Sequence, residues 1–222
     1  MPRRVVPLVN GEIYHVINRG NASEKIFRDE RDFQRFIETL IYYQCAVPPF
    51  KFSLLKKLPF SEKAKIFREI REGRDFIVEI LAYCLMSNHY HLILRQRLES
   101  GVYNFARLTA NSYAHYFNLK NQRRGSLFES RFKALRVHNE FQLLHLSRYV
   151  HLNPLSASLV DSYENLLKYQ YSSLTEYLGR GKEAICERGT ILSQFKSGKD
   201  YESFVRDRAD YQRSLEEIKH LI

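Results

Sequence analysis

The most constraining feature of the sequence is a long apolar segment that one short polar turn interrupts. Residues 76–86 and 89–96 are predominantly apolar, and only Ser87 and Asn88 separate them. Two such runs joined by two polar residues predict a β-hairpin. We therefore expect two adjacent antiparallel strands, with the turn at Ser87 and Asn88.

Two histidines lie at the start of the second predicted strand. Residues two apart on a strand point to the same face, so His89 and His91 direct two imidazoles toward one point. Tyr90 between them points to the opposite face. Two convergent imidazoles are half of a metal site. The alternative is a pair of polar residues on the solvated face of a half-buried strand, and the spacing alone does not separate the two interpretations.

The remaining periodic segments predict an α+β fold. The expected order is strand, helix, strand, strand, helix, strand, which is the split βαβ or ferredoxin-like arrangement. It implies a four-stranded antiparallel sheet with two long helices on one face, and leaves the other face for a ligand or a further helix. The expected elements are strands at 11–18, 76–86, 89–96 and 127–137, and helices from Asp29 to before Pro48 and from Ser100 to the basic loop 120–125.

A further helix is expected from Asn139, a good N-cap, to Asn153, because the residue before a proline disfavours helical geometry. Tyr149 and Asn153 are four residues apart and so share one face of it. If this helix packs near the histidine strand, Asn153 can complete a three-ligand metal site with His89 and His91. Tyr149 would then stand beside the metal as a nucleophile. The alternatives are a packed tyrosine ring and an ordinary helix-terminal asparagine.

The length of 222 residues fits one domain with additions. We expect a main domain over residues 1–160 and a C-terminal helical extension over 161–222 that packs on it. An inserted segment at 47–75 contains its own short helix at 61–70, for which Ser61 is a plausible N-cap. The insertion can contact DNA, contact a partner or do neither.

The charge balance favours a polyanionic partner. The chain has 35 Lys and Arg against 25 Asp and Glu, a formal net charge of +10, which indicates nucleic acid more simply than any other ligand. Basic residues of this kind contact phosphates and supply salt-dependent affinity without sequence choice. Unpaired bases can also stack on rings such as Tyr14 or Phe128. The candidate DNA contacts are Arg19, Lys120, Arg123, Arg124, Arg131 and Lys133.

Cysteine usage and hydropathy predict a cytoplasmic protein. Cys45, Cys84 and Cys186 are far apart and odd in number, which fits a reducing compartment better than a disulfide framework. The N-terminal residues lack the apolar core of a signal peptide. No apolar run approaches the ~20 residues of a membrane span.

Five blocks of the sequence together resemble the single-tyrosine transposases of small bacterial insertion sequences. One block contains the His-hydrophobic-His motif and another the Arg-Tyr-Val-His-Leu-Asn-Pro run of the nucleophile helix. The full set resembles the branch called REP-associated tyrosine transposases, which act on repeated extragenic palindromes. Tyr90 departs from the pattern, because the family usually has an aliphatic residue there. The matching blocks are residues 14–21, 82–94, 125–133, 148–155 and 169–179.

This resemblance implies a ferredoxin-like HUH endonuclease that cleaves and rejoins single-stranded DNA beside palindromic hairpins. It implies that Tyr149 attacks a phosphodiester and forms a 5′-phosphotyrosine, without a nucleotide cofactor. His89, His91 and Asn153 would hold Mg²⁺ or Mn²⁺, which would polarise the scissile phosphate. The protein would act as a monomer or a homodimer, with no membrane partner.

Two other functions are weighed against this one. A domesticated hairpin-DNA-binding protein without turnover would keep the basic surface, but the intact His89, His91 and Tyr149 argue against it. A metal-dependent phosphohydrolase would use water in place of tyrosine, and the lack of an Asp/Glu cluster near His89 argues against that. A rolling-circle replication nickase shares the chemistry but usually carries further domains.

Overall fold

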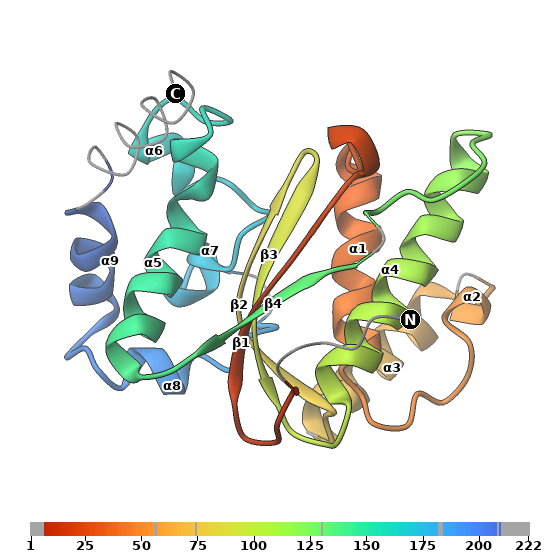
Figure 1. Cartoon of the computed structure of the whole chain (residues 1–222). Coiled ribbons are helices and arrows are strands. Elements are labelled where there is room, and N and C mark those ends of the chain that lie inside the picture. The colour runs from red at the N-terminus through yellow and green to blue at the C-terminus, as the bar shows by residue number, and fades with distance from the viewer. Residues whose placement is uncertain are drawn as a thin grey trace.

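The structure is a computed structural model that describes residues 7–55, 57–73, 75–129, 131–181, 184–207 and 209. One antiparallel sheet of four strands, in the order β2-β3-β1-β4, forms its centre (Figure 1). This order and the sequence of elements confirm the predicted ferredoxin-like α+β fold. The strands are β1 (Ile13–Arg19), β2 (Val78–Met86), β3 (His89–Gln96) and β4 (Lys133–Val137).

Two long helices, α1 (Glu30–Tyr43) and α4 (Gly101–Lys120), pack together on one face of the sheet (Figure 1). Helix α1 begins after Asp29, whose side chain accepts a hydrogen bond from the Asp32 amide and so satisfies one of the unpaired amides of the first turn. A short 3₁₀ turn, η1 (Asn21–Ser23), precedes it. The insertion forms α2 (Phe52–Leu55) and α3 (Phe60–Gly73), which packs against α1.

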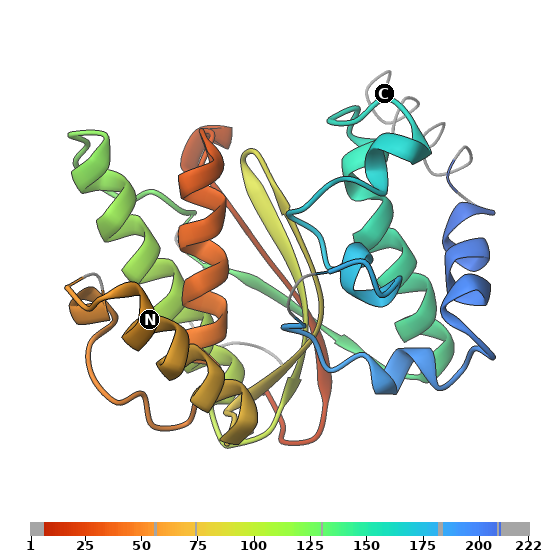
Figure 2. The same ribbon diagram turned by 180° about the vertical axis from the view of Figure 1, so that it is seen from behind.

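The opposite face of the sheet is covered by α5 (Glu140–Ser156), as the view from behind also shows (Figure 2). Asn139 caps this helix as predicted, because its side chain accepts from the Gln142 amide. The four short helices that follow are α6 (Tyr163–Leu166), α7 (Leu174–Tyr177), α8 (Gly189–Leu192) and α9 (Gly198–Arg206). All four contact α5, and α7 does so through the Tyr177 ring, which lies against His151. The division at residue 160 stays a prediction.

The prediction that Asn153 ends the third long helix is wrong. Helix α5 continues through Pro154 to Ser156, and the Ala157 amide donates to the Asn153 carbonyl. A proline this close to the end of a helix removes few helical hydrogen bonds. Pro154 and Leu155 are buried, so packing of the last turn against the rest of the protein offsets the local preference.

The predicted fourth strand, at 127–137, is too long. Only β4, Lys133–Val137, pairs with β1. Leu127 and Phe128 are consecutive and both buried, whereas a strand with one exposed face alternates buried and exposed residues. Phe128 makes only an isolated bridge to Gly20. Arg131 therefore lies outside the strand.

Ser61 is also not the N-cap of the insertion helix. Helix α3 begins one residue earlier, at Phe60, and the Lys63 amide already donates to the Pro59 carbonyl. Proline is well suited to helix starts because it has no amide to satisfy there. The helix extends to Gly73, beyond the predicted end at residue 70.

The core between the sheet and the two long helices is rich in aromatic rings. Phe36 is fully buried, and its ring contacts Phe27, Tyr90 and Tyr113. Tyr90 points to this face, as predicted from the alternation, and its hydroxyl hydrogen-bonds with Asn18. That bond satisfies the phenol of a tyrosine whose ring is fully buried.

The outer edge of β2 is covered by the segment that follows α6. The Leu85 amide donates to the Tyr171 carbonyl at 2.9 Å, and the Ser173 amide donates to the Tyr83 carbonyl at 3.0 Å. An exposed strand edge would otherwise be open to pairing with other chains. Buried His151 of α5 holds the same segment, with its ring nitrogens 2.8 Å from Ser173 Oγ and 2.7 Å from the hydroxyl of Tyr201 in α9.

Among the described residues, none of the helices combines the length and the apolar character that a bilayer crossing requires.

Replacing Phe36 by alanine should lower the free energy of unfolding by about 3–5 kcal/mol, because the substitution leaves a cavity among three rings. Phe60→Ala is the matched control, since the Phe60 ring is 86% exposed and its removal should cost less than about 0.5 kcal/mol. Urea unfolding followed by circular dichroism measures both. Equal losses in the two variants would contradict this description of the core.

Candidate active site

His89 and His91 project from one face of β3, the face on which α5 packs. Their ring centroids are 5.0 Å apart, with the planes nearly perpendicular. His91 lies opposite Ile17 of β1, and His89 lies opposite Arg19. The predicted convergence of the two imidazoles is therefore present in the structure.

Tyr149 reaches this pair from α5 of the same chain. Its ring centroid is 5.7 Å from that of His91, in an edge-to-face arrangement. The tyrosine ring is partly buried, and its backbone carbonyl accepts a hydrogen bond from Asn153 Nδ2 at 3.1 Å. Tyr149 and Asn153 thus share one face of α5, as their spacing predicts.

A third histidine, His15 of β1, belongs to this cluster and was not predicted as a site residue. Its Nε2 lies 2.9 Å from His91 Nδ1, and the two rings stack with centroids 5.1 Å apart. Its ring also contacts the Tyr149 ring edge-on at 6.2 Å. The one available sequence signal was its position on a strand with apolar neighbours at alternate residues, and that signal does not reveal the partner strand.

Burial keeps the three histidines neutral at neutral pH. Removal from water lowers the pKa of His15 and of His89 to about 4 in each case, and Arg19 contributes to the shift of His89. Burial is also the main reason why the pKa of His91 lies well below its ordinary value, with additional repulsion from His15, His89 and Arg19. A neutral imidazole has one nitrogen with a lone pair, which is the form that binds metals.

Hydrogen bonds at the Nδ1 atoms decide which lone pairs face the site. His89 Nδ1 is 2.7 Å from Asn88 Oδ1, which can only accept, so His89 is protonated at Nδ1. If His91 Nδ1 likewise donates to His15 Nε2, both His89 and His91 keep a lone pair on Nε2. Partners of this kind orient metal-binding histidines in known sites.

Within the part of the chain that the structure describes, no group of three or more His, Cys, Asp or Glu side chains is arranged to hold a metal. A metal bound by His89 and His91 would therefore need another kind of ligand. The Asn153 side chain is nearly buried, one turn of α5 beyond Tyr149, and its amide nitrogen is the atom used in the bond to Tyr149. Its carbonyl oxygen is the ligand atom that remains.

The candidate DNA contacts divide into three groups. Arg19 and Lys133 are exposed and, by strand register, lie on the same face as the histidine pair. Lys120 instead lies 2.7 Å from both Asp29 and Asp32, and Arg123 lies 2.6 Å from Glu24, so these two basic groups already pair within the protein. The last two candidates, Arg124 and Arg131, are exposed outside the strands.

Neither aromatic ring considered for base stacking is accessible. Tyr14 is 1% exposed and Phe128 is 6% exposed, because both rings point into the core. The hypothesis that either ring stacks on DNA is wrong. In Tyr14 the hydroxyl is also occupied, since it accepts a hydrogen bond from the Val9 amide at 2.7 Å.

Comparisons with known proteins agree with this geometry. The family model described as "Transposase IS200 like" matches residues 41–153, just over half of the chain, and this range includes His89, His91, Tyr149 and Asn153. A solved structure described as "Structure of the REP associates tyrosine transposase bound to a REP hairpin" shares the fold, with a TM-score of 0.54 and 16% sequence identity. The similarity covers 86% of this chain and 93% of that one. No curated protein matched the chain.

In the metal-free protein, ¹⁵N chemical shifts should show His89 and His91 protonated at Nδ1 and His15 carrying its lone pair on Nε2. His15→Phe removes the acceptor and should give a mixture of His91 tautomers, whereas His15→Gln keeps an acceptor and should restore the Nδ1–H form. Long-range ¹H–¹⁵N correlation spectra measure this directly. A wild-type His91 protonated at Nε2 would contradict the arrangement, whatever the variants show.

Proposed function

Because this chain belongs to the IS200-like transposase family, we propose that it cleaves and rejoins single-stranded DNA beside palindromic hairpins through a 5′-phosphotyrosine intermediate. The observation that carries the proposal is the contact of the Tyr149 ring with His91 within one chain, at 5.7 Å between centroids. The proposed nucleophile and the two proposed histidine ligands thus belong to the same chain.

In the proposed reaction, the Tyr149 hydroxyl oxygen attacks the phosphorus of a phosphodiester and loses its proton. The bond between phosphorus and the 3′ oxygen breaks, and that oxygen takes up a proton to become a free 3′-hydroxyl. The DNA fragment downstream of the break stays attached to the protein through its 5′ phosphate, as a phosphotyrosine. Attack by another 3′-hydroxyl reverses these steps and rejoins strands, so the energy of the phosphodiester is conserved and no nucleotide is consumed.

His89, His91 and Asn153 are the residues we propose as ligands of a divalent metal, Mg²⁺ or Mn²⁺. The lowered pKa values of the two histidines and the amide oxygen of Asn153 fit such an ion, and a mixed nitrogen and oxygen set is also compatible with other divalent ions. When bound, the ion would polarise the scissile phosphate and stabilise the charge that develops on it. His15 and Asn88 would hold the two ligand rings in place.

Arg19 and Lys133 are the proposed phosphate contacts closest to the site, because they lie on the histidine face of β1 and β4. The structural neighbour is bound to a REP hairpin, which supports a hairpin as the partner here. Lys120 and Arg123 are less suited to this role, since DNA would have to compete with their carboxylate partners.

Tyr149→Phe should reduce the covalent adduct with a hairpin-bearing single strand by at least about 100-fold in the presence of Mn²⁺, because the nucleophilic oxygen is lost. Binding of the same DNA should change little. Tyr103→Phe is the control, since Tyr103 is 49% exposed on α4, away from the sheet face that carries the histidines. Denaturing gels measure the adduct and fluorescence anisotropy measures binding.

Three outcomes would be informative. An undiminished adduct in Tyr149→Phe would remove this residue from the role of nucleophile. Cleavage without any protein-bound DNA in the wild type would indicate a hydrolase that uses water. Hairpin binding without cleavage at any metal concentration would indicate a DNA-binding protein without turnover.

A further inference from the structure

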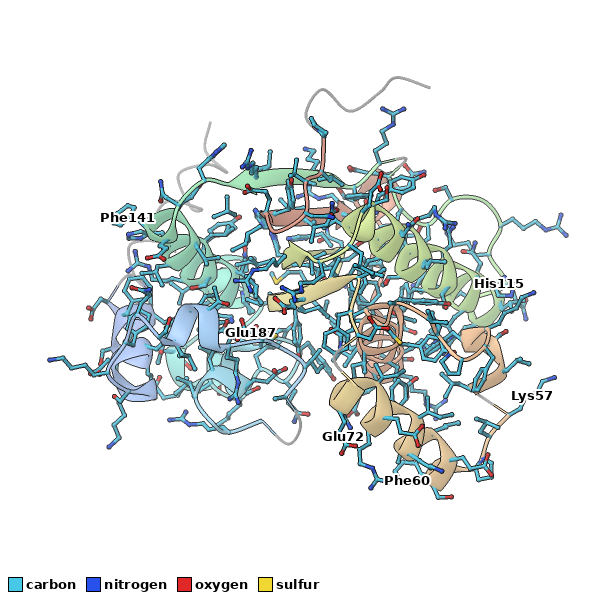
Figure 3. The ribbon with its side chains drawn as sticks, turned by 90° about the horizontal axis from the view of Figure 1, so that it is seen from below. Lys57, Phe60, Glu72, His115, Phe141 and Glu187 are labelled. Carbon is cyan, nitrogen blue, oxygen red and sulfur yellow. The ribbon has the colours of Figure 1, made fainter. Side chains whose placement is uncertain are left out.

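Two adjoining cavities form a groove along the outer side of β2, away from the histidine cluster. One cavity has a volume of about 730 Å³ and the other about 560 Å³, and both are lined by Arg71 and Ile185. One wall of the groove is α3 of the insertion, and the other is made by side chains from residues 167–181 and 184–192. Figure 3 shows the two walls from below, with Phe60 and Glu72 labelled on α3 and Glu187 on the opposite side.

Helix α3 uses its two faces for different purposes. Ile66 and Ile70 pack toward α1 in a small apolar cluster. The residues of α3 that line the groove recur every three or four positions and include both aromatic rings and positive charges. They are Phe60, Lys63, Ala64, Phe67 and Arg71. The Phe60 side chain is 86% exposed, so its ring is open to a ligand.

The rest of the groove has an apolar floor and a basic second wall. Ile37 and Ile41 of α1 form part of the floor. Lys168 and Arg180 lie on the wall opposite α3. A ligand in this groove would therefore meet positive charge from both sides above an apolar surface.

The acidic residues of the groove are largely engaged by the protein itself. Glu176 is buried, and its carboxylate accepts hydrogen bonds from the Tyr83 hydroxyl and from the amides of Ile185 and Cys186. Glu79 forms an ion pair with Arg95 at 2.8 Å. By contrast, Lys63 and Lys168 are in no ion pair with the residues that the structure describes, so both ammonium groups are available to an anion.

We propose that this groove binds single-stranded DNA, with bases against Phe60 and the apolar floor and phosphates at Lys63 and Lys168. Base stacking on an aromatic ring beside a basic track is the usual way in which proteins hold single strands without regard to sequence. The groove lies one strand away from the histidine pair, because Tyr83 of β2 lines it and the next residue of β2, Cys84, pairs with His91 of β3.

The choice of DNA as the ligand rests on the proposed function, but the binding itself does not require cleavage. An acidic peptide is the competing occupant, because it would satisfy the lysines equally well. However, an acidic peptide has no planar base to place against Phe60. The net charge of +10 belongs to the whole chain and does not distinguish the two ligands. The observations therefore favour the single strand, and the experiment includes the peptide.

The first test measures the affinity for fluorescein-labelled (dT)₂₀ by anisotropy, in EDTA and at several salt concentrations. The double variant Lys63→Ala/Lys168→Ala should bind about 10-fold more weakly, and the slope of log K against log salt should fall by about 1.4, as expected for two lost phosphate contacts. The control, Lys57→Ala/Lys199→Ala, removes the same charge from exposed lysines that do not line the groove. Equal losses in both double variants, or no loss in either, would overturn the proposal.

The second test locates the strand. An oligonucleotide with 5-iododeoxyuridine should crosslink to Phe60 or to its neighbours on α3 on irradiation, and Phe60→Ala should remove that adduct. Crosslinks confined to β1, β4 and α5, or displacement of (dT)₂₀ by a poly-glutamate peptide at equal charge, would overturn the proposal. Repeating the binding with Tyr149→Phe separates the two claims, because groove binding should persist in a variant that forms no covalent adduct.

Discussion

The candidate site depends on the packing of α5 against the sheet face that α1 and α4 leave open. That packing places the Tyr149 ring edge-on to His91, and the His15–His91 contact at 2.9 Å fixes the ring that the tyrosine meets. Burial under α5 also keeps the imidazoles neutral, since solvent-exposed histidines would carry more charge near neutral pH. One helix therefore supplies the proposed nucleophile, a candidate ligand and part of the cover that keeps water from the histidines.

Much of this arrangement could be predicted because it follows from local sequence. The hairpin at Ser87 and Asn88, the shared face of His89 and His91, and the cap at Asn139 each depend on residues within one element. The contact of His15 with His91 could not be predicted in the same way. It depends on the register of β1 against β3, which pairs residues more than seventy positions apart.

Where local rules failed, tertiary packing explains the difference. The preference against helix before Pro154 is outweighed by the burial of Pro154 and Leu155, so α5 extends one further turn. Lys120 and Arg123 were predicted from composition to contact DNA, yet α1 and the loop before it supply carboxylates that pair with them. The groove between α3 and the segments 167–181 and 184–192 combines parts that are distant in the chain, and none of them alone indicates it.

The most direct test of the central claim is pulsed electron paramagnetic resonance of the Mn²⁺-loaded protein with ¹⁵N-labelled histidine. If His89 and His91 hold the ion beside Tyr149, the spectrum should show couplings to two imidazole nitrogens, and His91→Ala should leave one. A spectrum with no histidine coupling, or one that His91→Ala does not change, would contradict the account.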